Sequence, residues 1–187
     1  MARQELTLEL KNMAAETLQC VHTALPGTII SFDPEACTAS VNPCGKYKKP
    51  DGALIGFPPL SNVPVWFPQG GAAQMAWPVR GGDGCLLVFA EQALDQWRTG
   101  VGSGTDLRFD LTNAIAIPGL KAGFNPLAVE AVARGALVLA SGGNRFALSM
   151  DGIQIDGNVT VNGSLNVGGN SSIGGNLTVG GTITGHM

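Results

Sequence analysis

Polar and apolar positions repeat every six residues along the C-terminal part of the chain, from Asp151 to His186. Read in sixes, this segment is DGIQID, GNVTVN, GSLNVG, GNSSIG, GNLTVG and GTITGH. Apolar residues fill the third and fifth places of almost every repeat; Ser171 is the clear exception, and Gly185 ends the pattern. A spacing of two places both side chains on one face of a strand, and glycine at the start of each later repeat permits a tight turn. The pattern therefore predicts a β repeat with a single apolar face.

One chain offers too little surface to cover the apolar face of this repeat and to pair its strand edges. A lone ribbon leaves both of its edges unpaired, and a single-chain solenoid with about three repeats per coil would obtain only about two coils from this segment. Several copies wound around one axis would pair the edges and enclose a common apolar core. Because a three-sided prism suits a six-residue period, we expect residues 146–187 to form an intertwined triple-stranded β-helix in a homotrimer.

The middle of the chain shows strand periodicity of another kind. Short apolar runs are separated by Gly, Asp and Pro turns, and Glu91–Trp97 favours one or two helical turns. The runs are Thr28–Phe32, Ala39–Val41, Val63–Phe67, Ala76–Val79, Cys85–Ala90 and Asn113–Pro118. Roughly ninety residues with five or six strands suit a small antiparallel barrel of the OB type. We therefore expect an OB-fold domain over residues 26–120, followed by a linker over residues 121–145, in a mainly β protein.

Helical periodicity is confined to the N-terminal segment. Leu6, Leu10, Met13, Thr17 and Cys20 follow a three-four spacing, which predicts an amphipathic helix over residues 3–24 within an N-terminal segment 1–25. Pro26 and Gly27 are expected to end it. Two interpretations remain open at this point. The helix docks on its own domain, or it contacts a partner protein or its symmetry mates.

Composition narrows the possible classes of function. The net charge is −3 with no basic run, so the electrostatics of a nucleic-acid binder are missing. No segment reaches the roughly 18 apolar residues of a membrane helix, and Glu5 and Glu9 interrupt any apolar signal core, so we expect synthesis in a cytoplasm. The four cysteines, Cys20, Cys37, Cys44 and Cys85, lack zinc-site spacing and are expected to be free thiols in a reducing compartment.

Catalytic groups are scarce in this sequence. A Ser-His-Asp or Cys-His arrangement would have to use His22 or His186, the only two histidines, so we expect a structural protein rather than an enzyme. Two alternatives are weighed beside this. A hexapeptide-repeat acyltransferase predicts many more repeats and a catalytic histidine within the helix body. A trimeric adhesin or fibre stalk shares the β tail but predicts a receptor-binding head after it.

Several motifs of the middle zone occur in a distinctive order. They are Leu60–Pro68, Trp77–Val79, Gly82–Phe89, Leu94–Trp97, Arg108–Leu111 and Ala114–Gly119. In this respect the chain resembles the central-spike, or baseplate assembly protein V-like, family of contractile-tailed phages over roughly residues 26–120. The resemblance implies an OB-fold domain followed by a triple-stranded β-helix in a homotrimer. It also implies a location in the virion baseplate, at the tip of the tail tube.

The resemblance further implies a mechanical function. Sheath contraction drives the tube, and the spike punctures the outer membrane of the host first. The implied partners are the baseplate hub and tail-tube proteins, through the N-terminal helix and the OB-fold, with a tip-capping protein at the point. Contact with the outer membrane is transient, and no nucleic acid is bound. A tail free of charged side chains lowers the cost of entering lipid, because a buried charge costs several kcal/mol.

A metal site at the apex is the one candidate ligand site. Members of that family often end in two histidines one residue apart, and three copies bind iron; this chain has His186 alone, between Gly185 and Met187. Three symmetry-related His186 side chains are sufficient to hold one iron or zinc ion through imidazole nitrogens. The alternative is that His186 frays at the chain end or meets a capping protein.

Metal analysis of the purified protein tests this site. We expect the metal content to fall when His186 is replaced by alanine, because the imidazoles are the only ligands that the apex offers. An unchanged metal content in His186→Ala would contradict the site.

Overall fold

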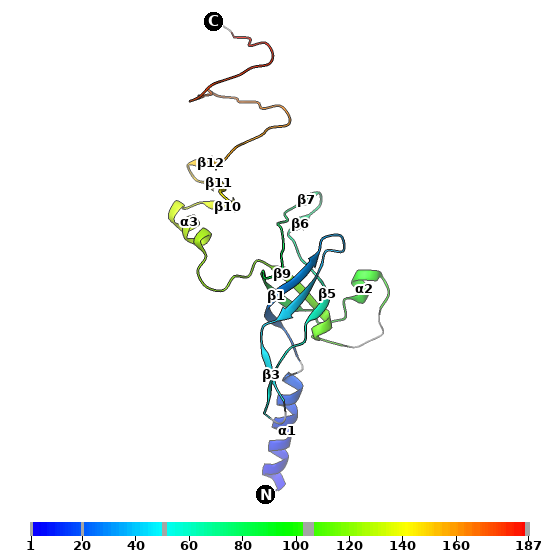
Figure 1. Ribbon diagram of the computed structural model, residues 1–187. Helices are drawn as coiled ribbons and strands as arrows, with labels where there is room; N and C mark the ends of the chain where they lie inside the picture. The colour runs from blue at the N-terminus through cyan, green and yellow to red at the C-terminus, as the bar shows by residue number, and fades with distance from the viewer. Residues whose placement is uncertain (1, 20, 50–51, 103–106, 186–187) are drawn as a thin grey trace. The chain divides into compact units, whose positions relative to one another are not determined.

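The computed structural model describes residues 2–19, 21–49, 52–102 and 107–185 (Figure 1). It divides into two compact units, Met1–Phe124 and Asn125–Met187. The first unit contains α1, α2 and the strands β1–β9, and the second contains α3 and β10–β12. The expectation of a mainly β protein with few helices is confirmed.

Helix α1 spans Ala2–Gln19 and is shorter than the predicted helix over residues 3–24. Strand β1 begins at Ala24, so Pro26 and Gly27 lie within a strand instead of ending a helix. Tertiary hydrogen bonds account for the difference. The His22 N–H donates to the Phe109 carbonyl at 3.0 Å, and the Phe89 N–H donates to the Thr23 carbonyl at 3.0 Å. These bonds use the backbone groups of residues 22 and 23 in tertiary contacts instead of in a longer helix.

Five strands form the main sheet of the first unit, in the order β5-β2-β1-β8-β9. They are β1 (Ala24–Asp33), β2 (Thr38–Pro43), β5 (Leu60–Pro64), β8 (Gly84–Phe89) and β9 (Ala114–Pro118). Every pair of neighbours in this order is antiparallel. Five of the six predicted apolar runs fall on these strands. The sixth, Ala76–Val79, forms no strand; it contains Pro78, which cannot donate to a ladder.

This sheet is curled, and its two edge strands meet. Val65, directly after β5, forms a parallel bridge with Ala116 of β9. The Trp66 N–H donates to the Ala116 carbonyl at 2.9 Å. Alternate side chains point into the enclosed space, as the alternating burial of β8 and β9 shows. The buried core consists of Ile29, Ala39, Val41, Val63, Val65, Cys85, Leu87, Phe89, Ala114 and Ala116.

Smaller elements complete the first unit. Two short hairpins are formed by β3 (Lys46–Lys48) with β4 (Leu54–Gly56) and by β6 (Gln69–Gly70) with β7 (Ala73–Gln74). Helix α2 spans Asp95–Thr99, a few residues after the start of the predicted segment Glu91–Trp97. A 3₁₀ turn, η1 (Leu111–Asn113), leads into β9. Asp110 caps that turn, and hydrogen bonds from the Thr112 hydroxyl and backbone N–H hold the Asp110 pKa below its usual range.

The second unit contains a helix and a sheet where the sequence predicted a linker over residues 121–145. Helix α3 spans Pro126–Arg134, with the Asn125 side chain accepting from the Leu127 N–H and Gly135 in the left-handed region at the C-cap. Strands β10 (Leu137–Ser141), β11 (Asn144–Ser149) and β12 (Gly152–Asp156) follow as an antiparallel meander in the order β10-β11-β12. Asn-Pro before a helix and Gly after it are capping signals that the sequence offers.

Residues 157–185, the remainder of the six-residue repeat, carry no helix or strand in the single chain and lie exposed. In Figure 1 they form the extended orange and red trace. Within residues 146–187, strands are present only at the start, where β11 and β12 pair as part of an antiparallel meander. The β-helix expected over these residues stays a prediction.

Gly27 provides a test of how tightly the core of the first unit is packed. A Cβ at position 27 would lie 2.8 Å from Val41 Cγ1 and 3.1 Å from Cys85 Sγ. Gly27→Ala is therefore expected to lower the free energy of unfolding by about 1–3 kcal/mol, measured by thermal or denaturant unfolding. Gly70→Ala is the matched control, because a Cβ there meets nothing within 4 Å. Equal stability of the two variants would contradict the packing around Gly27.

Candidate assembly surface

The register of the β10–β12 meander collects apolar side chains on one face. Cross-strand partners in an antiparallel sheet point to the same side. The pairings place Leu137, Leu148 and Ile153 in one row and Leu139, Phe146 and Ile155 in the next. We call these six residues the apolar sheet face. Each row crosses all three strands, so the six side chains form one continuous apolar patch. The next pair on the same side, Ser141 with Asn144, is polar.

The apolar sheet face lies exposed in the single chain. Leu137 is 60% exposed and Ile153 is 62% exposed, while Leu139, Leu148 and Ile155 are each between 44% and 49% exposed. Phe146 is half-buried. A contiguous apolar patch of this kind, on a strand meander, is typical of a surface that another protein covers.

Helix α3 covers the opposite face of the same sheet. Val138 and Ala147, which are paired across β10 and β11, are 7% and 5% exposed. Arg145 and Asp156 are also cross-strand partners on this side of the sheet, and both contact the helix. The two faces of the meander therefore differ in kind. One is covered and polar at its margin, and the other is bare and apolar.

A network of ion pairs fastens α3 to the sheet. The Glu130 carboxylate lies 3.1 Å from Arg134 Nη2 and 3.2 Å from Arg145 Nε. Arg134 Nη1 lies 3.4 Å from Asp156 Oδ2, and Gln154 Nε2 donates to Asp156 Oδ1 at 2.8 Å. Helix α3 is thus joined to strands β11 and β12 through four charged side chains that balance one another. This arrangement holds α3 on its own face and leaves the apolar sheet face uncovered.

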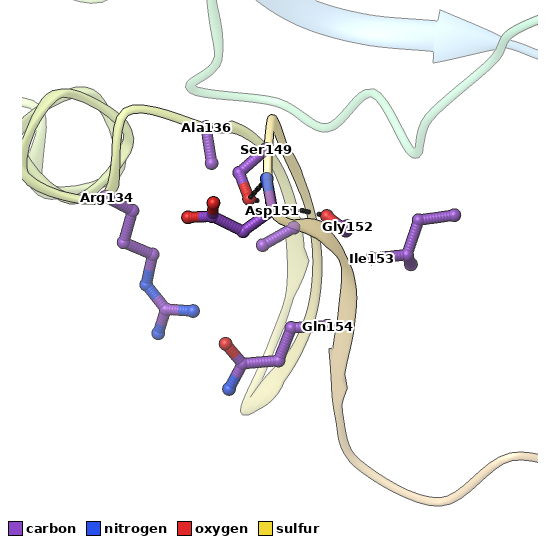
Figure 2. A pocket seen from close by; sticks show the side chains of 8 residues that line it. Arg134, Ala136, Ser149, Asp151, Gly152, Ile153 and Gln154 are labelled. Atoms are coloured by element: carbon purple, nitrogen blue, oxygen red, sulfur yellow. Dashed lines mark hydrogen bonds between the residues drawn. The ribbon is translucent and has the colours of Figure 1, made fainter.

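A hollow of about 510 Å³ lies at the polar side of this sheet (Figure 2). Figure 2 shows the Asp151 and Gln154 side chains on the same side as Arg134, while Ile153 points the other way. The Arg134 guanidinium already contacts Glu130 and Asp156. Its charge is therefore neutralised within the unit, so the hollow is better explained by the packing of α3 than as a ligand site.

The apolar sheet face continues into the six-residue repeat. Strand β12 occupies the first repeat, so Ile153 and Ile155 belong to both features. The following apolar residues are all exposed in the single chain: Val159, Val161, Leu165, Val167, Ile173, Leu177, Val179 and Ile183. Along the sequence, the apolar places thus continue from the meander into the tail, with one interruption at Ser171.

The residues that the sequence put forward as ligands lie in separate places. His186 and Cys20 lie outside the described residues, so the apex metal site stays a prediction. His22 follows the end of α1 instead of lying on it, and its ring contacts Phe57 at 5.4 Å and Phe89 at 5.7 Å between centroids. With Tyr47, Pro58 and Leu111, His22 and Phe57 line a largely apolar hollow of the first unit. This packing gives His22 a structural explanation.

Three cysteines are free thiols in the described part of the chain. Cys37 and Cys44 are exposed and Cys85 is buried. Burial, reinforced by the neighbouring Cys44, raises the pKa of the Cys85 thiol to about 11. Among the described residues, no three His, Cys, Asp or Glu side chains gather as a metal site. Within the same residues, no helix has both the length and the apolar composition needed to cross a membrane.

Comparison with known proteins bears on the first unit. A family model described as the phage protein Gp138 N-terminal domain matches residues 25–119. These residues begin in β1 and end directly after β9, so the matched segment is the curled sheet with its connections. It covers just over half of the 187 residues. No curated protein shows a significant match to the chain.

The ion-pair network can be tested through Glu130. Glu130→Gln removes the carboxylate that two arginines share, and we expect the unit to lose about 1 kcal/mol, because each partly exposed pair contributes a fraction of that. Faster hydrogen exchange of the α3 amides is the measurement. The matched control is Glu91→Gln, whose carboxylate contacts Arg108 at 3.5 Å with both side chains more than half exposed. Unchanged exchange in Glu130→Gln would show that the network does not fasten α3.

Proposed function

Because the chain belongs to the family of phage proteins with the Gp138 N-terminal domain, and is thus a phage structural protein and virion component, we propose a specific place for it in the particle. It is the central spike at the tip of a contractile tail tube, it acts as a homotrimer, and it punctures the outer membrane of the host when the sheath contracts. The observation that carries this proposal is the row of apolar places from the meander into the tail, which a single chain leaves bare.

The curled sheet supports an OB-fold for the first unit. An OB-fold is a five-stranded, partly open barrel. Here five antiparallel strands lie side by side, with β5 and β9 at the edges. The two edges meet through a parallel bridge between Val65 and Ala116. Such a barrel is a compact base to which a narrow tail can be attached.

Self-association is favoured by the chemistry of the tail. Its inward places are aliphatic, and its outward places are Asn, Thr, Ser and Gln. The best complement for such a uniform, repeated surface is another copy of it, because equal periods keep every apolar place opposed to another. Ordering the tail costs conformational entropy that only burial of the apolar row can offset. Three chains wound together bury that row and pair the strand edges at the same time.

The puncturing role rests on the absence of charge from the tail. Beyond Asp156 the sequence contains no Asp, Glu, Lys or Arg. A narrow rod with only uncharged polar groups outside meets a smaller desolvation penalty in a bilayer than a charged one. The tail therefore suits brief passage through a membrane under force. It is not suited to stable residence there, because its outer surface is polar.

At the opposite end of the sequence, α1 is proposed to contact the hub that joins the spike to the tail tube. Leu10 is 58% exposed and Met13 is 63% exposed, so their side of the helix is not covered by the rest of the chain. A helix that its own chain leaves exposed, with leucine and methionine among its side chains, is suited to a groove on a partner or to bundling with its own copies.

Removal of the tail after Asp156 tests the proposal. This truncation keeps β12 and every ion pair of α3 but deletes the later repeats. We expect the full chain to be a trimer by light scattering that resists SDS without heating, and the truncated chain to lose the SDS resistance. Particles assembled with the truncated chain are expected to attach to the host and contract but to fail at penetration.

Deletion of one whole repeat, residues 157–162, is the matched control. It shortens the tail but keeps the apolar places in phase, so SDS resistance should persist. A monomeric full chain would contradict the spike. A trimeric chain whose truncated form still penetrates would point to a fibre stalk instead.

A further inference from the structure

The tail poses a problem of register for any assembly of identical chains. Apart from Ser171, its repeats differ little in size and polarity, so a chain shifted by six residues would still oppose apolar places to apolar places at nearly every position. When successive repeats of a strand are nearly equivalent, the side chains specify the pairing register only weakly. Shifted trimers would have uneven ends and a blunted point, so some feature outside the later repeats must align the chains.

The apolar sheet face has the properties that such a feature needs. Its two rows, Leu137 with Leu148 and Ile153, and Leu139 with Phe146 and Ile155, do not repeat along the chain. Phe146 is the one aromatic residue between positions 125 and 187. A large ring in a surface of aliphatic side chains fits its counterparts in a single alignment, because a shift of one row would set the ring against a smaller side chain.

The face is also held in a fixed shape. Two tight turns join its strands, with Gly142 and Gly152 at positive φ. Helix α3 is fastened to the back of the sheet by Glu130 and Arg145, whose contact is 3.2 Å. The six apolar side chains are thus presented by a small folded unit instead of by a flexible segment, which lowers the entropy lost on association.

Resting on the proposed trimer, we propose that the apolar sheet faces of three copies pack together as an alignment clamp, which sets the register in which the tail repeats wind. A second and a third copy of this chain are the occupants. Ile153 and Ile155 lie in both the face and the first repeat, so whatever covers the repeat also covers the face. No charged side chain on the face calls for a partner of opposite charge.

Disulfide formation between cysteines placed in the tail measures the register of one chain relative to another. Val161 and Val167 occupy the same place in successive repeats, so a chain carrying Val161→Cys pairs with one carrying Val167→Cys only if the chains are shifted by one repeat. Cys20, Cys37 and Cys44 are replaced by serine in both chains, because these thiols would cross-link as well. The two chains are produced together, one with a tag that changes its size, and are treated with a mild oxidant. A disulfide-linked hybrid dimer on a denaturing gel then reports a shift. Val161→Cys in both chains gives the hybrid that proves mixing.

The clamp is weakened by Leu139→Ser with Phe146→Ser, which leaves all of the repeats unchanged. We expect little hybrid dimer with the intact face and a several-fold increase with the weakened face. Val129→Ser with Val132→Ser is the matched control, because it removes two exposed apolar side chains from α3 instead. A trimer with a weakened face and no increase in hybrid would overturn the clamp.

A second variant applies if the weakened chain does not assemble. Duplication of residues 157–162 in one chain leaves the face intact and moves the later repeats outward by one. With register counted from the clamp, Val161→Cys of the longer chain pairs with Val161→Cys of the ordinary chain, and the two Val167→Cys positions do not pair. The reverse result would show that the tail aligns from its tip and would overturn the proposal. A monomeric full chain by light scattering refutes the proposed trimer itself and is recognised separately.

Discussion

The uncovered apolar row that runs from the meander into the tail is the constraint on which the rest of the molecule depends. Aliphatic side chains stand at the third and fifth places of most repeats. In the single chain, those from Val159 to Ile183 remain exposed. Water opposes that exposure, and the chain provides no second layer to relieve it. A long apolar row without a cover is compatible with a functional protein only when other molecules cover it. The proposed self-association therefore rests on the arrangement of the row and on no single residue within it.

The β10–β12 meander makes a different kind of interaction on each side of its sheet. On the helix side, Glu130 accepts from two arginines and Arg134 reaches Asp156, so charge is satisfied internally. On the other side, six apolar residues carry no polar group. Ion pairs hold geometry well but add little stability when they are partly exposed, whereas apolar contacts supply the free energy of association. The ion pairs thus shape the sheet within one chain, and the apolar side is where the proposed association would add stability.

The first unit solves a different problem. Its core is small, with alanines at positions 39, 114 and 116 and a glycine at position 27, where a Cβ would crowd Val41. Small residues allow the strands of a tightly curled sheet to approach, so that β5 and β9 meet through Val65 and Ala116. The family match ends where this sheet ends. The family model therefore covers the sheet of the first unit, and the second unit with the tail lies outside it.

Sequence by itself determined the features that are periodic or bounded by local signals. The six-residue period, the mainly β class and the strands of the main sheet follow from spacing and turn residues, because side-chain direction in a strand depends on parity alone. Tertiary structure decided where α1 ends, because hydrogen bonds that join residues 22 and 23 to Phe109 and Phe89 outweigh helical spacing. It also decided the apolar sheet face. Leu137, Phe146 and Ile155 lie on three different strands, and only the register of those strands shows that they share one side.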